Sequence, residues 1–393
     1  MSPLIYLVAG EESGDALGAG LMRALRARVP GVRFVGVGGA RMTREGLDSL
    51  FPMAEMSVMG ILPVIARLPS LLRRIDQTAK AVVAARPDAL VIIDSPDFTH
   101  RVARRARKRL PDLTVINYVS PTVWAWRPGR AKAMRAYVDH VMALKPFEPA
   151  AHQRLGGPPC TYVGHPLIER TDALRPAPGE RRPIGEGPLE LLVLPGSRRS
   201  EVSRLMAPFG EALGHLSKAL GGREIALTLP AVDHVLPLIE AGVRDWPITP
   251  TIVRGEAAKD AAFRRAHAAL AASGTVTLEL ALSGVPMVVA YKVSKLEEQL
   301  RWLLTVDTIV LANLVLGEKA IPEFVQDQCR GDTLCAALAP LCADTPARRA
   351  QEDAFARIDA AMDLGGETPS EAAARVVLET MSAALDDFTS TLD

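Results

Sequence analysis

A short stretch near the beginning of the chain, LIYLVAGEESGD at residues 4–15, decides the fold class. Its first six residues are apolar, as in a buried strand, and the glycines and acidic residues that follow mark a sharp turn. Similar apolar runs alternate with amphipathic helical patterns farther along, at Phe34–Val37, Leu90–Ile93, Thr114–Val119 and Val138–Leu144. This alternation predicts an α/β protein with a parallel sheet.

The same rhythm occurs twice, which predicts two domains. Residues 171–189 are rich in proline, glycine and charge, and we interpret them as a linker. Strand patterns then resume at Leu189–Leu194, Glu224–Leu229, Thr249–Val253, Ala268–Ala271 and Pro286–Ala290. We therefore expect doubly wound domains at residues 1–170 and 171–367. Two helical patterns, at 346–362 and 370–385, close the chain. The second predicts a helix at about 368–387, which is a candidate to pack back on the first domain.

Composition indicates a folded cytoplasmic protein. The 393 residues are 48% hydrophobic, yet no apolar run approaches the roughly 20 residues of a membrane-spanning helix. The chain starts without a basic leader, and its four cysteines have no C-x-x-C spacing. These features predict neither a signal peptide, a zinc site nor a disulfide framework.

Charge is divided unevenly along the chain. Residues 1–170 contain 24 Lys and Arg against 14 Asp and Glu, a net charge of +10, whereas the remainder contains 22 against 31, a net charge of −9. The first half therefore carries a field that attracts anionic lipid or phosphate. Nucleic acid is disfavoured as a partner, because no zinc finger, RNP-type sequence or basic motif interleaved with aromatics accompanies the charge.

The segment Met56–Ile75 mixes bulky apolar residues with arginine, as interfacial anchors do. A helix pair packed on its own domain explains it equally well. The basic run between Arg101 and Arg109 has the ordinary interpretation of a solvated helix face. Together, the two segments favour peripheral contact with a membrane.

Ligands of doubly wound domains gather where strands turn into helices. In the first turn, Gly10 and Gly14 permit a ligand to approach the backbone closely, and Ser13 is placed to cap the helix. The alternative interpretation is a purely structural turn with a serine cap. In the turn at residues 93–98, Ser95 is expected to be the helix cap. Asp94 precedes this cap at the end of an apolar strand, where a carboxylate is costly unless it binds something. Asp94 is therefore the catalytic candidate.

Two tryptophans, Trp124 and Trp126, share one post-strand loop with Arg127. Such a loop suits stacking on a sugar or contact with acyl chains, although a packed aromatic loop explains the pattern nearly as well. With Gly10, Ser13, Gly14 and Asp15, these residues are the candidates for binding an acceptor.

The second half carries the candidate anion site. Residues 194–201 combine flexible backbone and hydroxyls with two guanidinium groups immediately before a helix, a composition suited to diphosphate. A second loop, at Ser273–Thr275, begins another helix, and Glu279 lies one helical turn beyond Thr275. When the phosphates of a nucleotide bind at this helix start, a carboxylate at Glu279 can accept hydrogen bonds from both hydroxyls of the nucleotide's ribose. An exposed helical glutamate is the alternative for Glu279. The candidate donor-binding residues of these turns are Gly196, Ser197, Arg198, Ser273, Gly274, Thr275 and Glu279.

Taken together, the motifs resemble the lipid-A-disaccharide synthase family. The similarity covers almost the whole chain and rests on VAGEESGD (8–15), VMG (58–60), IDSPDF (93–98), YVSPTVWAWR (118–127), LPGSR (194–198) and ASGT (272–275). The resemblance implies GT-B architecture, with two Rossmann-like domains. It implies transfer of 2,3-diacylglucosamine from its UDP conjugate to 2,3-diacylglucosamine 1-phosphate, which forms a β-1,6-linked disaccharide and releases UDP at the cytoplasmic face of the bacterial inner membrane.

The resemblance also implies roles for single residues. The family's functional aspartate falls on Asp94, its diphosphate-site arginine on Arg198, and a motif asparagine on Asn313, although Ala312 stands where related sequences often have proline. An α-linked donor and a β-linked product imply an inverting displacement with a general base, for which Asp94 is the candidate. No cofactor and no metal are expected.

Two other functions remain open from the sequence. One is another two-domain UDP-sugar enzyme, such as the peptidoglycan glucosaminyltransferase or a UDP-sugar epimerase. The other is a nucleotide-regulated membrane-binding protein without catalysis. The tryptophan and Asp94 motifs argue against another UDP-sugar enzyme. Catalytic turnover of the two sugar substrates would exclude the non-catalytic membrane-binding protein.

Overall fold

A computed structural model describes residues 2–55, 61–294 and 306–390. The chain forms two compact units, which we describe separately: unit 1 comprises residues 1–166 and 364–393, and unit 2 comprises residues 167–363. The units divide after residues 166 and 363, slightly before the predicted boundaries after residues 170 and 367.

Unit 1 contains a sheet of parallel strands in the order β2-β1-β3-β4-β5-β6. Its middle strands β3 and β4 are buried along their whole length, as parallel strands covered on both faces are. This explains why β3 appears in the sequence as a continuous apolar run, whereas β4 also buries Thr114 and Asn117. The strands are β1 (Leu4–Ala9), β2 (Arg33–Val37), β3 (Ala89–Ile93), β4 (Thr114–Tyr118), β5 (His140–Ala143) and β6 (Cys160–Tyr162).

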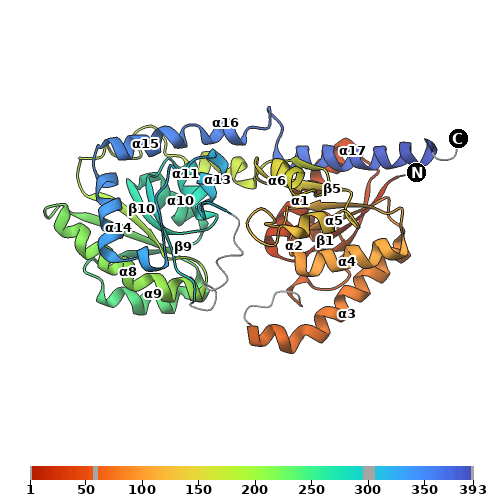
Figure 1. Cartoon of the computed structure of the whole chain (residues 1–393), viewed down its shortest axis with the longest axis horizontal. Coiled ribbons are helices and arrows are strands. Elements are labelled where there is room, and N and C mark those ends of the chain that lie inside the picture. Colours follow the sequence, from red (N-terminus) through yellow and green to blue (C-terminus); the bar gives the residue numbers. More distant parts are fainter. Residues whose placement is uncertain (1, 56–60, 295–305, 391–393) are drawn as a thin grey trace. The chain divides into compact units, whose positions relative to one another are not determined.

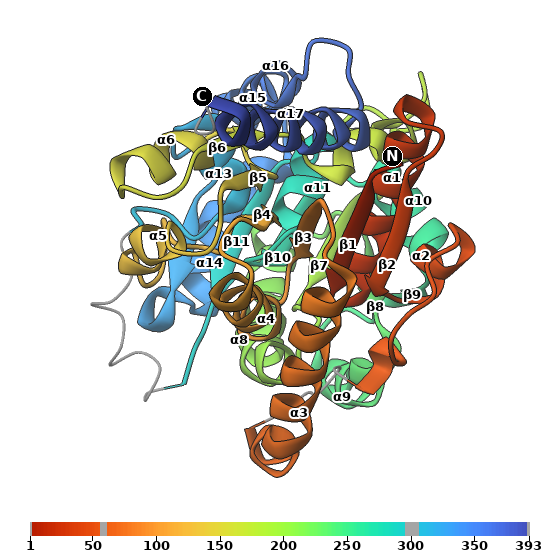
Figure 2. The same cartoon turned by 90° about the vertical axis from the view of Figure 1, so that its right-hand side faces the viewer.

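Alternate residues of these strands build two cores. Ile5 and Leu7 of β1 belong to the core on one face, which includes α1 (Glu12–Arg28) and α17 (Pro369–Ser390). Tyr6 and Val8 belong to the opposite core, with α3 (Ile61–Ala85) and α4 (Pro96–Arg109). Figures 1 and 2 show α17, from the end of the chain, lying along α1 from its beginning. The remaining helices of unit 1 are α2 (Ala40–Arg44), α5 (Gly129–Met134) and α6 (Glu148–Arg154).

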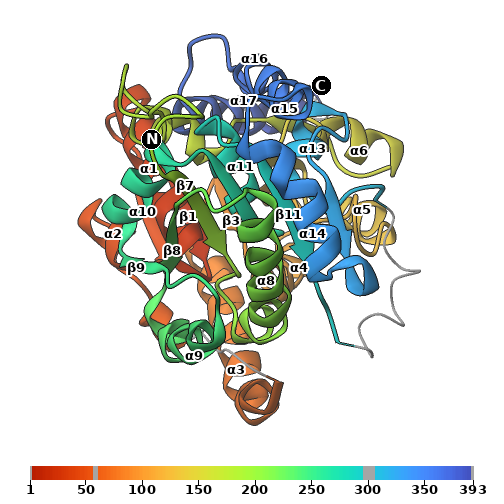
Figure 3. The same cartoon turned by 90° about the vertical axis from the view of Figure 1, so that its left-hand side faces the viewer.

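Unit 2 repeats the parallel design with a different strand order, β12-β11-β10-β7-β8-β9. Figure 3 shows its sheet with α8 and α14, which pack against each other. The strands are β7 (Leu189–Leu194), β8 (Ile225–Ala231), β9 (Thr251–Arg254), β10 (Ala268–Ala272), β11 (Met287–Tyr291) and β12 (Glu323–Val325). The helices are α7 (Thr171–Leu174), α8 (Arg199–Ala219), α9 (Leu236–Gly242), α10 (Glu256–Arg265), α11 (Val276–Leu282), α13 (Leu311–Leu316), α14 (Gly331–Leu338), α15 (Pro346–Phe355) and α16 (Ile358–Met362).

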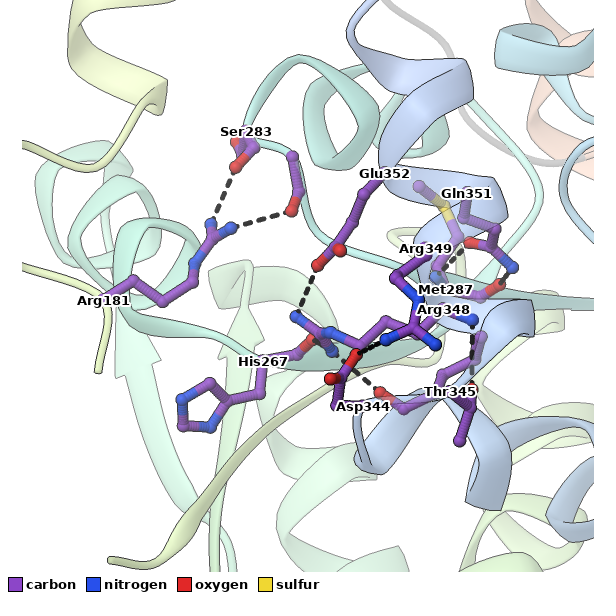
Figure 4. A network of polar contacts seen from close by, with 12 residues as sticks. Arg181, His267, Ser283, Met287, Asp344, Thr345, Arg348, Arg349, Gln351 and Glu352 are labelled. Atoms are coloured by element: carbon purple, nitrogen blue, oxygen red, sulfur yellow. Dashed lines mark hydrogen bonds and ion pairs between the residues drawn. The ribbon is translucent and has the colours of Figure 1, made fainter. Parts of the chain in front are cut away.

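A buried arginine fastens α15 to the sheet of unit 2 (Figure 4). Arg348, of which only 5% is exposed, donates from Nη1 to the carbonyl oxygens of His267 at 2.7 Å and Leu341 at 2.8 Å. One turn along, the side-chain amide of Gln351 makes two hydrogen bonds to the backbone of Met287 in β11. The helix is thus held by polar contacts that would be costly to leave unpaired in the interior.

Most of the expected elements occur, with three differences. The short edge strands β6 and β12 were not expected, and the helical pattern at 346–362 forms two helices, α15 and α16, rather than one. Ser370–Leu385 lies within α17, which packs in unit 1. Residues 56–60 of the expected membrane-contacting segment, and the side chains of residues 61–68, lie outside the described parts of the molecule. Among the helices as far as they are described, none has the length and apolarity to span a bilayer.

Candidate functional site

Unit 2 has a cavity of about 650 Å³ at the carboxyl ends of its central strands. The turn after β7 and the turn after β10 line it together with residues that follow β8 and β9. β7 lies between β8 and β10, so the strand order reverses direction there. This switch point is where open α/β sheets bind ligands. The predicted donor-binding residues that line the cavity are Gly196, Ser197, Arg198, Ser273, Gly274, Thr275 and Glu279.

The turn after β7 is organised by Glu201, which the sequence interpretation did not single out. Its Oε2 accepts from the backbone N–H groups of Ser197 at 3.3 Å and Arg198 at 3.2 Å, and its Oε1 accepts from Nη1 of Arg198 at 3.0 Å. Gly196 has φ +110°, and a Cβ there would lie 2.6 Å from Glu201 Oε2. The turn's amides are therefore engaged by a carboxylate. Arg198, whose side chain is 76% exposed, presents positive charge to the cavity.

Glu279 is not the unengaged carboxylate that its helical position suggested. Only 9% of the residue is exposed, and its Oε1 accepts from Lys259 Nζ at 2.9 Å. In the turn before α11, the Ser273 hydroxyl donates to the carbonyl oxygen of Ile309 at 2.6 Å, while Gly274 and Thr275 are exposed. Thr275 stands at the helix N-cap without a side-chain capping bond.

Asn313 has a structural role in place of the predicted contact with the donor. Its side chain is 1% exposed, donates from Nδ2 to the Ile321 carbonyl oxygen at 2.9 Å, and accepts at Oδ1 from the Ile321 N–H at 2.9 Å. The amide thus pairs with both backbone groups of one residue. It does not line the cavity.

Unit 1 has its own switch point, where β1 lies between β2 and β3. Asp94 follows β3 directly, and its Oδ2 accepts from the Ser13 hydroxyl at 3.3 Å across the switch point. Its Oδ1 accepts from the Ser95 N–H at 2.8 Å. The backbone is left-handed at both residues, with φ +52° at Asp94 and +43° at Ser95. Strained non-glycine backbone of this kind persists where the surroundings impose it, and it gathers at functional sites.

Several details of this site correct the sequence interpretation. Ser13 lies inside α1 rather than capping it. Ser95 is the N-cap residue of α4, as expected, but its hydroxyl makes no capping bond and donates to Glu11 Oε1 at 3.0 Å. Gly10 is needed because a Cβ there would lie 2.5 Å from the Ser95 Cβ. At Gly14 a Cβ would meet the Ile93 carbonyl oxygen at 3.2 Å.

Asp15 is a structural residue rather than a group presented to an acceptor. It is 4% exposed, and its carboxylate accepts from the backbone N–H groups of Gly39 at 2.7 Å, Arg41 at 2.8 Å and Met42 at 3.0 Å. These are the donors at the start of α2, which a carboxylate satisfies well.

The tryptophan loop is partly packed. Trp124 donates from Nε1 to the fully buried Glu148 at 3.0 Å, and its ring meets Phe147 edge to face at 5.0 Å between centroids. Trp126 is half-buried, and the guanidinium of the exposed Arg127 lies 5.1 Å from its ring centroid. Trp124 therefore fits the packed alternative, whereas Trp126 and Arg127 remain acceptor candidates.

Two functional candidates escaped the sequence interpretation. Lys259 lines the cavity beside Glu279, and Arg170 lies 3.8 Å from the same carboxylate oxygen. Lys259 belongs to the charged first turns of α10, a pattern typical of a solvated helix, and Arg170 is distant in the chain. Only the folding of the sheet brings them to Glu279. Among the described residues, no group of three or more His, Cys, Asp or Glu side chains is placed to hold a metal ion.

The two doubly wound units have the GT-B architecture. Solved structures of similar fold include S. aureus MnaA with UDP, with a TM-score of 0.61 and 12% identity over 98% of this chain and 97% of that one. Anabaena HepE in complex with UDP and glucose has a TM-score of 0.56 and 12% identity over 97% of this chain and 100% of that one.

Sequence comparison identifies the family. Residues 5–377 match the family model described as lipid-A-disaccharide synthetase. The lipid-A-disaccharide synthase of Rhodopseudomonas palustris (strain HaA2) is 57% identical over 379 residues, which cover 96% of each chain. That of Nitrobacter hamburgensis is 56% identical over 382 residues, again 96% of each. The chain belongs to the lipid-A-disaccharide synthase family.

Proposed function

We propose that this chain transfers 2,3-diacylglucosamine from UDP-2,3-diacylglucosamine to 2,3-diacylglucosamine 1-phosphate. The products are a β-1,6-linked disaccharide 1-phosphate and UDP. The observation that carries the proposal is a cavity at the switch point of unit 2 that places Arg198 and Glu279 on its lining, in a chain matching the synthase family along nearly its whole length.

Recognition of the donor uses opposite charges for its two polar parts. The exposed guanidinium of Arg198 binds the diphosphate and stabilises charge that develops on UDP as it leaves. The turn from Ser273 to Thr275 adds exposed backbone and a hydroxyl to the same lining. Glu279 accepts from the ribose hydroxyls, for which a carboxylate has the required acceptors.

Transfer with inversion requires a base for the acceptor hydroxyl, and Asp94 is the proposed base. Its half-buried carboxylate is held by Ser13 and by the Ser95 N–H at the switch point of unit 1. This orientation by neighbours is what general-base catalysis needs. Gly10, Gly14, Trp126 and Arg127 are the proposed surroundings of the acceptor, and no metal takes part.

We also propose that the enzyme works at the cytoplasmic face of the inner membrane as a peripheral protein. In unit 1, α3 and α4 pack against each other (Figure 2). α3 exposes Leu72 and Arg73, and α4 exposes a row of basic side chains. Apolar insertion beside positive charge supports binding to anionic lipid. The basic residues exposed on α4 are Arg101, Arg104, Lys108 and Arg109.

The deciding experiment incubates the purified protein with both diacylglucosamine substrates and measures UDP release. UDP should appear only when donor and acceptor are both present, together with a disaccharide product. Binding of UDP without any turnover would instead indicate a nucleotide-binding protein. Conversion of the donor without acceptor would indicate another UDP-sugar reaction, and either result would refute the proposal.

A further inference from the structure

A cluster of five charged residues adjoins the cavity of unit 2, and we call it the Glu279 cluster. It consists of two cations and three carboxylates: Arg170, Lys259, Glu256, Asp260 and Glu279. Lys259 Nζ lies 2.9 Å from Glu279 Oε1 and 3.2 Å from Glu256 Oε1. Arg170 reaches Glu256 at 2.7 Å, Asp260 at 2.8 Å and Glu279 at 3.8 Å.

The two oxygens of Glu279 are treated differently by this cluster. Both cations approach Oε1. No described residue donates a hydrogen bond to Oε2. Oε2 is also absent from the fully buried polar atoms that lack a partner, so it is accessible from outside. Oε2 is therefore open to the cavity, whereas Oε1 is bound by Lys259 and approached by Arg170.

Burial makes this arrangement costly to leave uncompensated. Glu279 is 9% exposed and the Lys259 side chain 23% exposed, so an ionised carboxylate at this position needs a nearby cation. Burial by itself lowers the pKa of Lys259, but Glu279 and Glu256 outweigh it and leave that pKa above its usual value. Lys259 is thus a permanent positive charge against Glu279.

We propose that Lys259 is a positioning residue for recognition of the nucleotide's ribose. Resting on the proposed role of Glu279, the proposal states that Lys259 holds the carboxylate in one orientation, with Oε2 turned to the 2′- and 3′-hydroxyls of a ribonucleotide. Arg170 supports the same oxygen from the segment that begins unit 2. The opposing possibility is that Lys259 contacts the diphosphate directly, as cavity-lining lysines often do.

The test compares the dissociation constants of UDP and 2′-deoxy-UDP by calorimetry. Wild type should prefer UDP by roughly tenfold or more, as loss of a hydrogen bond to a charged acceptor predicts. In Lys259→Met this preference should approach one, and in Lys259→Arg most of it should remain. Arg349→Met, which removes an exposed ion pair with Asp344 in the same unit, should behave as wild type.

The variants separate the two proposals. Glu279→Gln should also abolish the preference, and if it does not, the ribose role of Glu279 fails together with the role of Lys259. If Glu279→Gln loses the preference but a folded Lys259→Met retains it, only the positioning role is wrong. Equal weakening of both nucleotides in Lys259→Met would show direct contact with the diphosphate and would likewise overturn the proposal.

A double variant covers the case in which Lys259→Met fails to fold because Glu279 is left unpaired. Lys259→Met combined with Glu279→Gln removes both charges together. Because Lys259 is proposed to act through Glu279, the double variant should bind UDP as Glu279→Gln alone does. A further tenfold loss of UDP affinity would mean that Lys259 touches the nucleotide itself.

Discussion

Asp94 is held by several local contacts, which help to offset the cost of its left-handed backbone. Its backbone is left-handed, its carboxylate accepts from Ser13 and from the Ser95 N–H, and its carbonyl oxygen accepts from the Thr99 hydroxyl at 2.6 Å. The sequence suggested a carboxylate without structural duties, and the structure gives it local ones. Hydrogen bonds that orient a carboxylate are also what a general base requires, so the two roles are compatible.

Asp94→Asn tests the catalytic role with little change of shape. The amide cannot take a proton, so turnover should fall by ~100- to 10,000-fold while the Michaelis constants for both substrates change little. Steady-state kinetics on a variant with wild-type circular dichroism gives the answer. Near-normal turnover would exclude Asp94 as the general base.

Arg198→Ala tests the diphosphate contact. The exposed guanidinium is expected to bind both the donor and the charge on departing UDP, so kcat/KM for the donor should fall by ~100-fold or more. Arg198 pairs with Glu201, which holds the turn, so the control must keep a positive charge there. Arg198→Lys keeps the charge but loses the bidentate geometry. Unaltered kinetics in folded Arg198→Ala would exclude the contact.

The sequence predicted which residues lie at the cavity where a strand ends in a turn, but not the contacts that depend on packing. Arg198 and Glu279 lie at the cavity because their positions after β7 and β10 follow from strand periodicity. Asn313 and Asp15 resemble ligand-binding residues in the sequence, yet each pairs with backbone groups that only the folded chain brings near. Lys259 was missed for the converse reason, since its partner Glu279 is distant in sequence.

At the scale of elements, Arg348 shows how a charged side chain can fasten a helix. Arg348→Met should lower the free energy of unfolding by about 2–4 kcal/mol, because the carbonyl oxygens of His267 and Leu341 lose a charged donor in the interior. Denaturant unfolding of the variant measures this loss. The neighbouring Arg349→Met, whose ion pair is exposed, should change stability by less than about 0.5 kcal/mol. Equal stability of the two variants would contradict the structural role.

The pair of helices α3 and α4 is the element expected to meet the membrane. Neutralising Arg101, Lys108 and Arg109 to glutamine should reduce flotation with vesicles of anionic lipid, and raised salt should reduce flotation of the wild type. A variant with Ile61, Leu62, Val64 and Ile65 changed to serine tests apolar insertion separately.

A matched control neutralises three exposed arginines of unit 2, at Arg330, Arg349 and Arg357, each in a surface ion pair. It should float as wild type does. If both triple variants lose flotation equally, the attraction depends on overall charge and not on α4. If none of the variants differs from wild type, the two helices do not bind the membrane.

Element boundaries were predictable where a local signal marks them. β1 and β7 have the predicted bounds, and Pro96 begins α4 as its position after Ser95 indicated. The edge strands β6 and β12 have three residues each, too few for a periodic pattern. The break between α15 and α16 carries neither proline nor glycine, so the sequence offered no reason to end a helix there.

At the scale of the whole molecule, buried histidines give unit 1 a sensitivity to acid. Burial lowers the pKa of His152 to about 4 and of His165 to about 4, and that of His100 to about 3. Between these values and the unfolded pKa near 6.5, the unfolded chain binds more protons, so stability falls as pH decreases through this range.

Each such histidine should contribute a slope of up to ~1.4 kcal/mol per pH unit between about pH 6.5 and pH 4. Chemical denaturation at a series of pH values measures the total. His152→Asn should show a smaller slope than wild type, since one proton-linked group is removed. An identical slope in the folded variant would mean that His152 does not titrate differently on unfolding.

The position of α17 has a consequence for the order in which the protein acquires its structure. Ala372, Ala373 and Val377 complete the core around α1, yet the ribosome makes them only after the whole of unit 2. Unit 2 is one continuous segment, residues 167–363, and can close as soon as it emerges. During synthesis, the apolar face of α1 therefore lacks its partner α17 until all of unit 2 has been made. We expect unit 1 to complete its folding only after unit 2 has been synthesised, with chaperone binding concentrated on α1 until α17 has emerged.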